Sequence, residues 1–85
     1  MCKPIAGNFV RARRECEVKP LQGSSDAFLS RSTIILSPKQ LGMVDETPGK
    51  DNDHRVIMFE FEEDGMPPAT LVAELHCSDL KGVEL

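Results

Sequence analysis

The sequence predicts a mainly β domain: a small antiparallel sheet, or a curled β-barrel, of four to six strands with one short helical turn near residues 38–41. Two observations favour this class. Apolar and polar side chains alternate over several short runs, which is typical of strands with one buried face. Gly-, Pro- and Ser-rich segments separate these runs at short intervals, as turns do in all-β proteins.

The chain has 85 residues, which is enough for one small domain spanning residues 1–85. Its apolar fraction is 40%, with four Phe and no Trp or Tyr, so the core must be mostly aliphatic. A domain of this size buries only a modest share of its surface, and such domains often gain stability from a partner subunit.

Residues 9–19 are the first predicted strand. Val10, Ala12, Cys16 and Val18 fall on one face, which Arg14 interrupts. Pro20 ends the run because proline has no N–H to donate. Residues 27–36 are the second predicted strand, favoured by its β-branched residues. Its end at residues 33–36 is apolar on both faces, which predicts an adhesive edge and homodimerisation.

A helical turn is expected next, with Ser37 as N-cap, Pro38 at the first helical position and Gly42 at the stop. The following segment, 43–54, is polar and lacks periodicity, so a mobile loop is expected there.

Residues 55–63 are the clearest strand, with Ile57, Phe59 and Phe61 on one face. Residues 70–77 fit a strand better than a helix, although the helix stays open, and the turn between the two runs suits a hairpin. Short connections favour a meander of sequential strands. The expected core is Val10, Ala12, Val18, Phe28, Ile34, Leu36, Ile57, Phe59, Phe61, Leu71 and Leu75.

Charge is divided unequally along the chain. Residues 1–42 hold seven Lys/Arg against three acids, a net charge of +4, whereas residues 43–85 hold three basic residues against eleven acids, a net charge of −8. Either the basic and acidic strands are neighbours and pair across the sheet, or the charges serve a partner. The candidate partner-binding residues are Arg11, Arg13, Arg14, Glu60, Glu62 and Glu63.

Nucleic-acid binding through Arg11, Arg13 and Arg14 is a minor alternative. The chain is acidic, with a net charge of −4, and has no Tyr or Trp for base stacking.

Asp51, Asp53 and His54 form the one local cluster of potential metal ligands, and hard cations favour such oxygen-rich loops. The calcium-loop pattern requires Gly at its sixth position, where this segment has Val56. A polar, solvated loop is therefore the simpler interpretation, and no cofactor is expected.

No catalytic motif is present. His76 and Cys77 are adjacent in a predicted strand, so their side chains would point to opposite faces, with Cys77 as a small core residue. Nothing in the pattern fixes a base beside a nucleophile, and no phosphate-binding or dinucleotide-binding glycine pattern occurs. The sequence therefore predicts a protein that is not an enzyme.

The N-terminal segment, Met1-Cys2-Lys3-Pro4-Ile5-Ala6-Gly7, is similar to the start of the small hydrogenase-maturation chaperones, which begin Met-Cys-x-x-Ile-Pro-Gly. Matches fall at Met1, Cys2, Ile5 and Gly7, but Ala6 stands where that family has proline. The resemblance implies a short β-barrel in which Cys2 handles an iron centre.

No apolar segment typical of a signal peptide or membrane span occurs, and an odd number of cysteines does not suit a disulfide scaffold, so a reducing cytoplasm is expected. The predicted function is that of a small intracellular interaction protein that binds another macromolecule through charged sheet faces, as a homodimer. The alternative is a small-ligand or metal-handling domain that uses Cys2 or the loop 51–54.

Overall fold

The computed structural model describes residues 4–62, 65 and 67–84. The elements follow the chain in the order β1 (Phe9–Ala12), β2 (Cys16–Val18), α1 (Asp26–Leu29), β3 (Ile34–Leu36), β4 (Gly42–Pro48), β5 (His54–Phe61), β6 (Ala69–His76), the 3₁₀ turn η1 (Cys77–Asp79) and β7 (Leu80–Val83).

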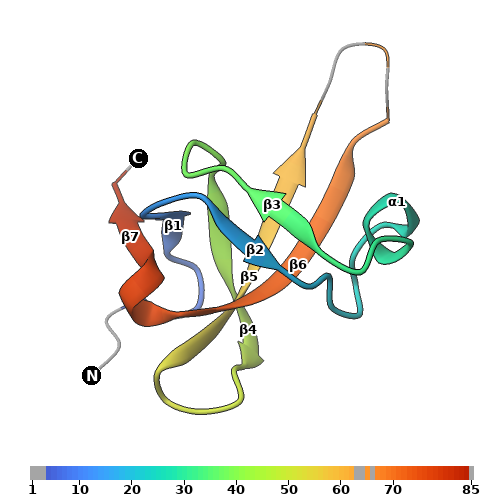
Figure 1. The fold of residues 1–85 in the computed structure, drawn as a ribbon. Coiled ribbons are helices and arrows are strands. Elements are labelled where there is room, and N and C mark those ends of the chain that lie inside the picture. Colours follow the sequence, from blue (N-terminus) through green and yellow to red (C-terminus); the bar gives the residue numbers. More distant parts are fainter. Residues whose placement is uncertain (1–3, 63–64, 66, 85) are drawn as a thin grey trace.

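Five strands form one antiparallel sheet in the order β6-β5-β4-β1-β7, and β2 pairs with β3 in a separate two-stranded ribbon. The ribbon and α1 lie over one face of the larger sheet (Figure 1). The prediction of a mainly β, antiparallel domain is confirmed. In the described part of the chain β6 and β7 are edge strands, so the sheet is open and the barrel alternative does not apply.

The core lies between the large sheet and the ribbon. Side chains in register across the sheet, such as Val10, Phe59 and Leu71, pack against Val18 and the buried side chains of β3. Nine of the eleven predicted core residues are buried, and Phe28 and Phe61 are partly buried against the core. Among the described residues, the prediction missed four buried apolar side chains, Val44, Val56, Ala73 and Leu80.

The predicted strand 9–19 is two strands, β1 and β2, that belong to different sheets. The chain leaves the β1 ladder at Arg13, whose backbone N–H donates to the carbonyl of Asp79 at 2.8 Å. The predicted strand 27–36 likewise divides into α1 and β3. The helix places Phe28 against Phe61, with ring centroids 5.1 Å apart, which stabilises this corner through an aromatic pair.

The helical turn expected at residues 38–41 is a hydrogen-bonded turn instead. Ser37 does cap it, because its Oγ accepts the Lys39 N–H at 3.2 Å, but Gly42 already belongs to β4.

The prediction of a loop at residues 43–54 is also wrong for its first half. Met43 and Val44 pair with Met58 and Ile57 of β5, so sheet pairing overrides the polar composition of this segment.

Residues 70–77, left open between strand and helix, are strand up to His76 and then form η1. The predicted hairpin of the last two strands is confirmed as β5–β6. The predicted meander holds only for β4, β5 and β6, since β1 lies between β4 and β7. No pattern in the sequence indicates β7, which is short and contains Gly82.

The open edge of β6 is covered by residues 21–25. The Ser24 Oγ accepts the N–H of Val72 at 2.8 Å, and the Ser25 Oγ accepts the N–H of Thr70 at 2.8 Å. The N–H groups of Leu21 and Ser25 donate to the carbonyls of Val72 and Thr70 in return. This loop therefore satisfies the hydrogen-bonding groups of an edge that would otherwise be free to pair with another chain.

Among the described residues, no helix is long and apolar enough to cross a membrane.

Candidate functional site

The face of the large sheet that points away from the β2–β3 ribbon carries an unbroken apolar row, and we call this side the outer face. In register, Phe9 of β1 is flanked by Val83 and Met43, and Met43 leads through Met58 to Val72. Residues in register on neighbouring strands share a face of the sheet. The apolar row therefore crosses all five strands, as Val83, Phe9, Met43, Met58 and Val72.

This row is accessible to a partner. Phe9 is 37% exposed, and the other four side chains are half-buried. A hollow of about 260 Å³ lies at its centre, lined by Phe9, Leu41, Gly42, Met43, Met58 and Glu60. Contiguous exposed apolar surface with polar neighbours is typical of interaction sites.

Charged side chains form a second row beside the apolar one. Arg11 and Lys81 are register partners on β1 and β7. Glu60 lies at the equivalent position of β5, two residues beyond Met58 as Arg11 is two beyond Phe9. All three side chains are exposed. The outer face is therefore basic at its β7–β1 end and acidic at β5.

Strand order decides between the two explanations of the charge division. β4 separates β1 from β5, which places these strands about 10 Å apart. Within the described residues, no ion pair involves Arg11, Lys81 or Glu60. Of the two explanations left open, the one in which the basic and acidic strands are neighbours does not hold, because β1 pairs with β4 and β7 instead.

The other predicted partner-binding residues diverge. Arg14 lies 3.4 Å from Asp79 with an 80% exposed side chain, a geometry that contributes little to stability. Arg13 lines a second hollow, a cleft at the β7 edge whose lining also includes Phe9 and Val83 of the apolar row. Glu62 is exposed just beyond β5, and Glu63 lies outside the described residues.

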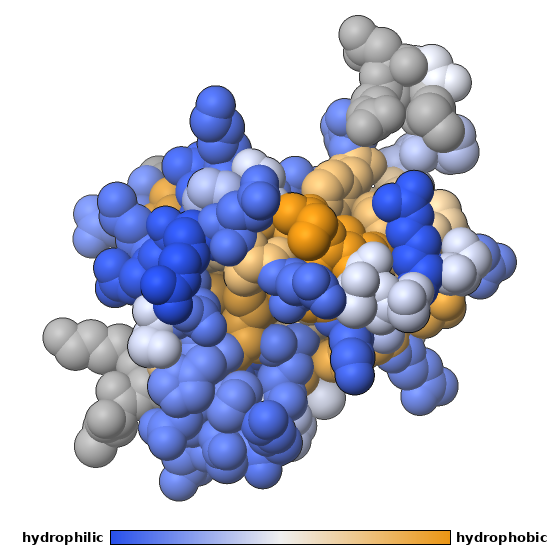
Figure 2. Space-filling model, viewed as in Figure 1, coloured by the Kyte–Doolittle hydropathy of each residue, from blue (hydrophilic) through white to orange (hydrophobic). Residues whose placement is uncertain are grey.

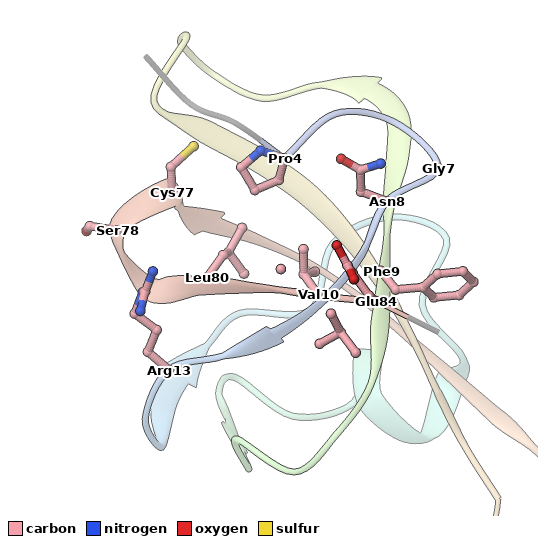
Figure 3. Close-up of a pocket in the computed structure, with 12 residues that line it drawn as sticks. Pro4, Gly7, Asn8, Phe9, Val10, Arg13, Cys77, Ser78, Leu80 and Glu84 are labelled. Atoms are coloured by element: carbon pink, nitrogen blue, oxygen red, sulfur yellow. The ribbon is translucent and has the colours of Figure 1, made fainter.

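The cleft beside Arg13 has a volume of about 780 Å³ and lies between the N-terminal segment and β7 (Figure 3). Arg13 and Ser78 lie toward one side of it, and Asn8 and Glu84 toward another. Gly82 lines this cleft, and a Cβ built on it would meet nothing within 4 Å. The lining residues are Pro4, Gly7, Asn8, Phe9, Val10, Arg13, Cys77, Ser78, Leu80, Gly82, Val83 and Glu84.

Of the predicted metal ligands, the structure brings Asp51 and His54 together. The His54 Nδ1 donates to the Asp51 Oδ1 at 2.7 Å, and the same oxygen accepts the Asp53 N–H at 2.9 Å. The hydrogen bond from His54 is the main reason why the pKa of Asp51 is lowered. These contacts close the turn from β4 to β5. Among the described residues no three His, Cys, Asp or Glu side chains are grouped as metal ligands.

His54 and His76 are register partners whose rings meet edge-on, with centroids 5.0 Å apart. The His76 Nδ1 accepts both the Ser78 N–H at 3.1 Å and the Ser78 hydroxyl at 2.8 Å. An imidazole nitrogen that already accepts a backbone N–H is poorly placed to act as a base toward that hydroxyl. The contact caps η1 and gives no support to nucleophilic catalysis.

The cysteines differ from expectation. Cys77 is disulfide-bonded and half-buried at the start of η1, so it is not the small core residue predicted. Cys16 is free and packs against the core, and its burial raises the pKa of the thiol. Cys2, the residue of the metal-handling alternative, lies outside the described residues.

The opposite surface, formed by the ribbon and α1, presents apolar residues among hydrophilic ones around β3 (Figure 2). Ile35 is 59% exposed there, while Ile34 and Leu36 point into the core. The segment 33–36 is therefore apolar on both faces as expected, with one face buried and one open to solvent.

Sequence reasoning missed most of the apolar row. Met43 lies in a segment predicted to be a loop, and Val83 in a strand that no pattern indicates. The alternation of Met58 with buried Ile57 and Phe59 was the available sign that β5 has two apolar faces. No protein-family model matches this chain, and neither a curated protein nor a solved structure matches it.

Proposed function

We propose that this chain is a non-enzymatic interaction domain that binds another protein through the outer face of its five-stranded sheet. One observation carries the proposal: β4 separates the basic strand from the acidic strand and leaves exposed charges of both signs beside an exposed apolar row. An apolar centre with a charged rim is the common anatomy of protein interfaces.

The two signs of charge on one face favour a protein over a nucleic acid. A phosphate backbone would be attracted to Arg11 and Lys81 but repelled by Glu60, about 10 Å away. A protein surface can oppose each sign with its complement, which gives specificity and faster association. The apolar row supplies burial, which charges alone do not.

Site-specific photocrosslinking tests this function. Phe9 is replaced by benzoylphenylalanine, a conservative change of an exposed ring, and the matched control carries the same group at Leu29 on α1, which is 46% exposed. We expect a discrete adduct from position 9 in cell extract and a much weaker one from position 29. The adduct should diminish between about 20 mM and about 500 mM NaCl because exposed charges are screened. Equal labelling from both positions, or none from position 9, would contradict the proposal.

The cysteines give two different indications of the cellular location. The cysteine count predicts the cytoplasm, whereas a disulfide at Cys77 is more typical of an oxidising compartment. Binding through the outer face depends on neither, because no cysteine lies in the apolar row.

A further inference from the structure

We infer that the partner of the outer face is a second copy of this chain, stacked face to face about a two-fold axis that runs parallel to the strands through β4. The inference rests on the proposed function of that face and names its partner. It is carried by the self-complementary order of the apolar row and of the charged row.

Rotation about this axis exchanges the two ends of the sheet and keeps each residue row opposite itself. In the apolar row, Met43 then meets the partner's Met43 on the axis. Phe9 meets the partner's Met58, and Val83 meets the partner's Val72. The two central hollows face each other at the axis, where side chains of one copy can enter the hollow of the other.

The same rotation brings charges of opposite sign together. The charged row runs Lys81, Arg11, Leu41, Glu60 and Thr70 from β7 to β6. Exchange of the two ends places Arg11 opposite the partner's Glu60, and Glu60 opposite the partner's Arg11. Leu41 meets the partner's Leu41 on the axis. Arg11 and Glu60, which lie one strand to either side of the axis, are thus each opposed by the other sign.

The other aligned two-fold axis, perpendicular to the strands, lacks this property. With this axis the two apolar rows still face each other. The charged row of one copy, however, would face the partner's residues on the other side of the apolar row. Glu60 would then lie opposite the partner's Val56, and Arg11 opposite the region of the partner's Gly7. The positions of Arg11 and Glu60 therefore favour the axis parallel to the strands.

The isolated chain also contains a repulsion that this dimer relieves. Arg11 and Lys81 are directly opposite each other on neighbouring strands, and like charges in such pairs are destabilising. Among the described residues no ion pair offsets them. The partner's Glu60 supplies the missing negative charge beside Arg11.

The small size of the surface indicates weak association. Four inter-strand steps span about 19 Å from Val83 to Val72. An interface of two residue rows over this width is smaller than the standard protein–protein interface of about 800 Å² per partner. We expect a reversible dimer with a Kd on the order of 10–100 μM.

Two charge reversals test the arrangement. Arg11→Glu leaves only negative charge at both contacts of a homodimer and brings the formal net charge from −4 to −6, and Glu60→Arg leaves only positive charge there and brings it from −4 to −2. Each variant alone should dimerise at least about tenfold more weakly than the original chain. An equimolar mixture should form heterodimers, because one contact then joins the two introduced charges, which are opposite in sign, and the other contact joins the original Arg11 and Glu60.

Sedimentation equilibrium from about 10 μM to about 1 mM measures these constants. The control pair, Lys19→Glu and Glu17→Arg, makes the same net-charge changes at exposed positions in and beside β2 and should leave the Kd unchanged. If dimerisation is restored in the mixture, both charge-reversed variants must also be folded. The double variant R11E/E60R should dimerise within about threefold of the original chain.

The outcomes separate this inference from the proposed function. A chain that stays monomeric at about 1 mM, or reversed variants whose mixture shows no recovery, would overturn the self-pairing. If position 9 still gives a heterologous crosslink in that case, the face binds a different protein and the proposed function survives. Loss of every crosslink from position 9 would overturn both.

Discussion

Two glycines flank Val10 in the large sheet, and they predict opposite responses to the same substitution. Val10 is the register partner of Gly42 on one side and of Gly82 on the other. A Cβ on Gly42 would lie 2.6 Å from the Phe59 ring and 2.7 Å from the Ile57 methyl group, whereas a Cβ on Gly82 meets nothing within 4 Å. Gly42→Ala should therefore destabilise the fold, and Gly82→Ala should not.

The magnitude follows from the displacement required. Moving the Phe59 ring from 2.6 Å to an ordinary contact of 3.4 Å is a shift of 0.8 Å, and this ring is fully buried. Overpacking of this kind costs about 1–3 kcal/mol, out of a total stability of about 4–13 kcal/mol for a chain of this length. Gly82→Ala should change stability by less than about 0.5 kcal/mol, or raise it slightly by restricting the unfolded chain.

The assay is urea unfolding followed by far-ultraviolet circular dichroism, since the chain has no Trp or Tyr for fluorescence. Phe59→Leu shortens the obstructing side chain, so it should reduce the loss of stability that Gly42→Ala causes. The double variant G42A/F59L should then be at least about 1 kcal/mol more stable than the two single effects added together. A Gly42→Ala variant within about 0.5 kcal/mol of the original chain, or strict additivity with Phe59→Leu, would refute the close packing between β4 and β5.

Three further predictions concern single side chains. The lowered pKa of Asp51 makes its ionised form stabilising at neutral pH, and this contribution should disappear as the pH falls below about 4. Carboxyl-carbon NMR should report a midpoint below the ordinary value for aspartate, and His54→Ala should raise it. Ser24→Ala removes the acceptor of the Val72 N–H and should cost about 1–2 kcal/mol, with faster exchange of that amide. Ser30→Ala, at the exposed C-cap of α1, should have neither effect. The pKa of Cys16 is raised by its burial and by Asp79, and Arg14 opposes this, so Asp79→Asn should accelerate alkylation at about pH 8 and Arg14→Ala should slow it.

Local alternation in the sequence predicts part of the fold well. In β6 the buried positions recur every second residue, and in β5 Ile57 and Phe59 do so beside a buried Val56. Both strands are predicted within one or two residues of their bounds. The prediction fails where pairing over long distances overrides composition. β4 contains Asp45, Glu46, Thr47 and Pro48, which are typical of a loop, yet its partner β5 holds it in the sheet. The change of sheet between β1 and β2 has one sign in the alternation of residues 9–19, namely Arg14, which interrupts the apolar face between Ala12 and Cys16.

The candidate site is predicted in part. Charge alone indicates Arg11 and Glu60, and both lie on the outer face. The same criterion indicates Arg13, Arg14 and Glu62, which lie just beyond the end of β1 or β5, where alternation no longer fixes the face that a side chain takes. The apolar row could not be predicted without knowledge of the strand order, since its five residues come from five strands.

Strand order is what gives the charge division its meaning. In a simple meander β1 would lie at an edge, and the basic and acidic strands could not be arranged symmetrically about a centre. Insertion of β1 between β4 and β7 makes β4 the middle strand, with Arg11 one strand to one side and Glu60 one strand to the other. The uncharged Leu41 and Met43 then lie at the centre of the face. A face that is apolar at its middle and opposite in charge at equal distances on either side is complementary to itself. The charge division of the sequence thus becomes a property of the outer face only through the position of β1, and the Arg11 and Glu60 reversals test that step directly.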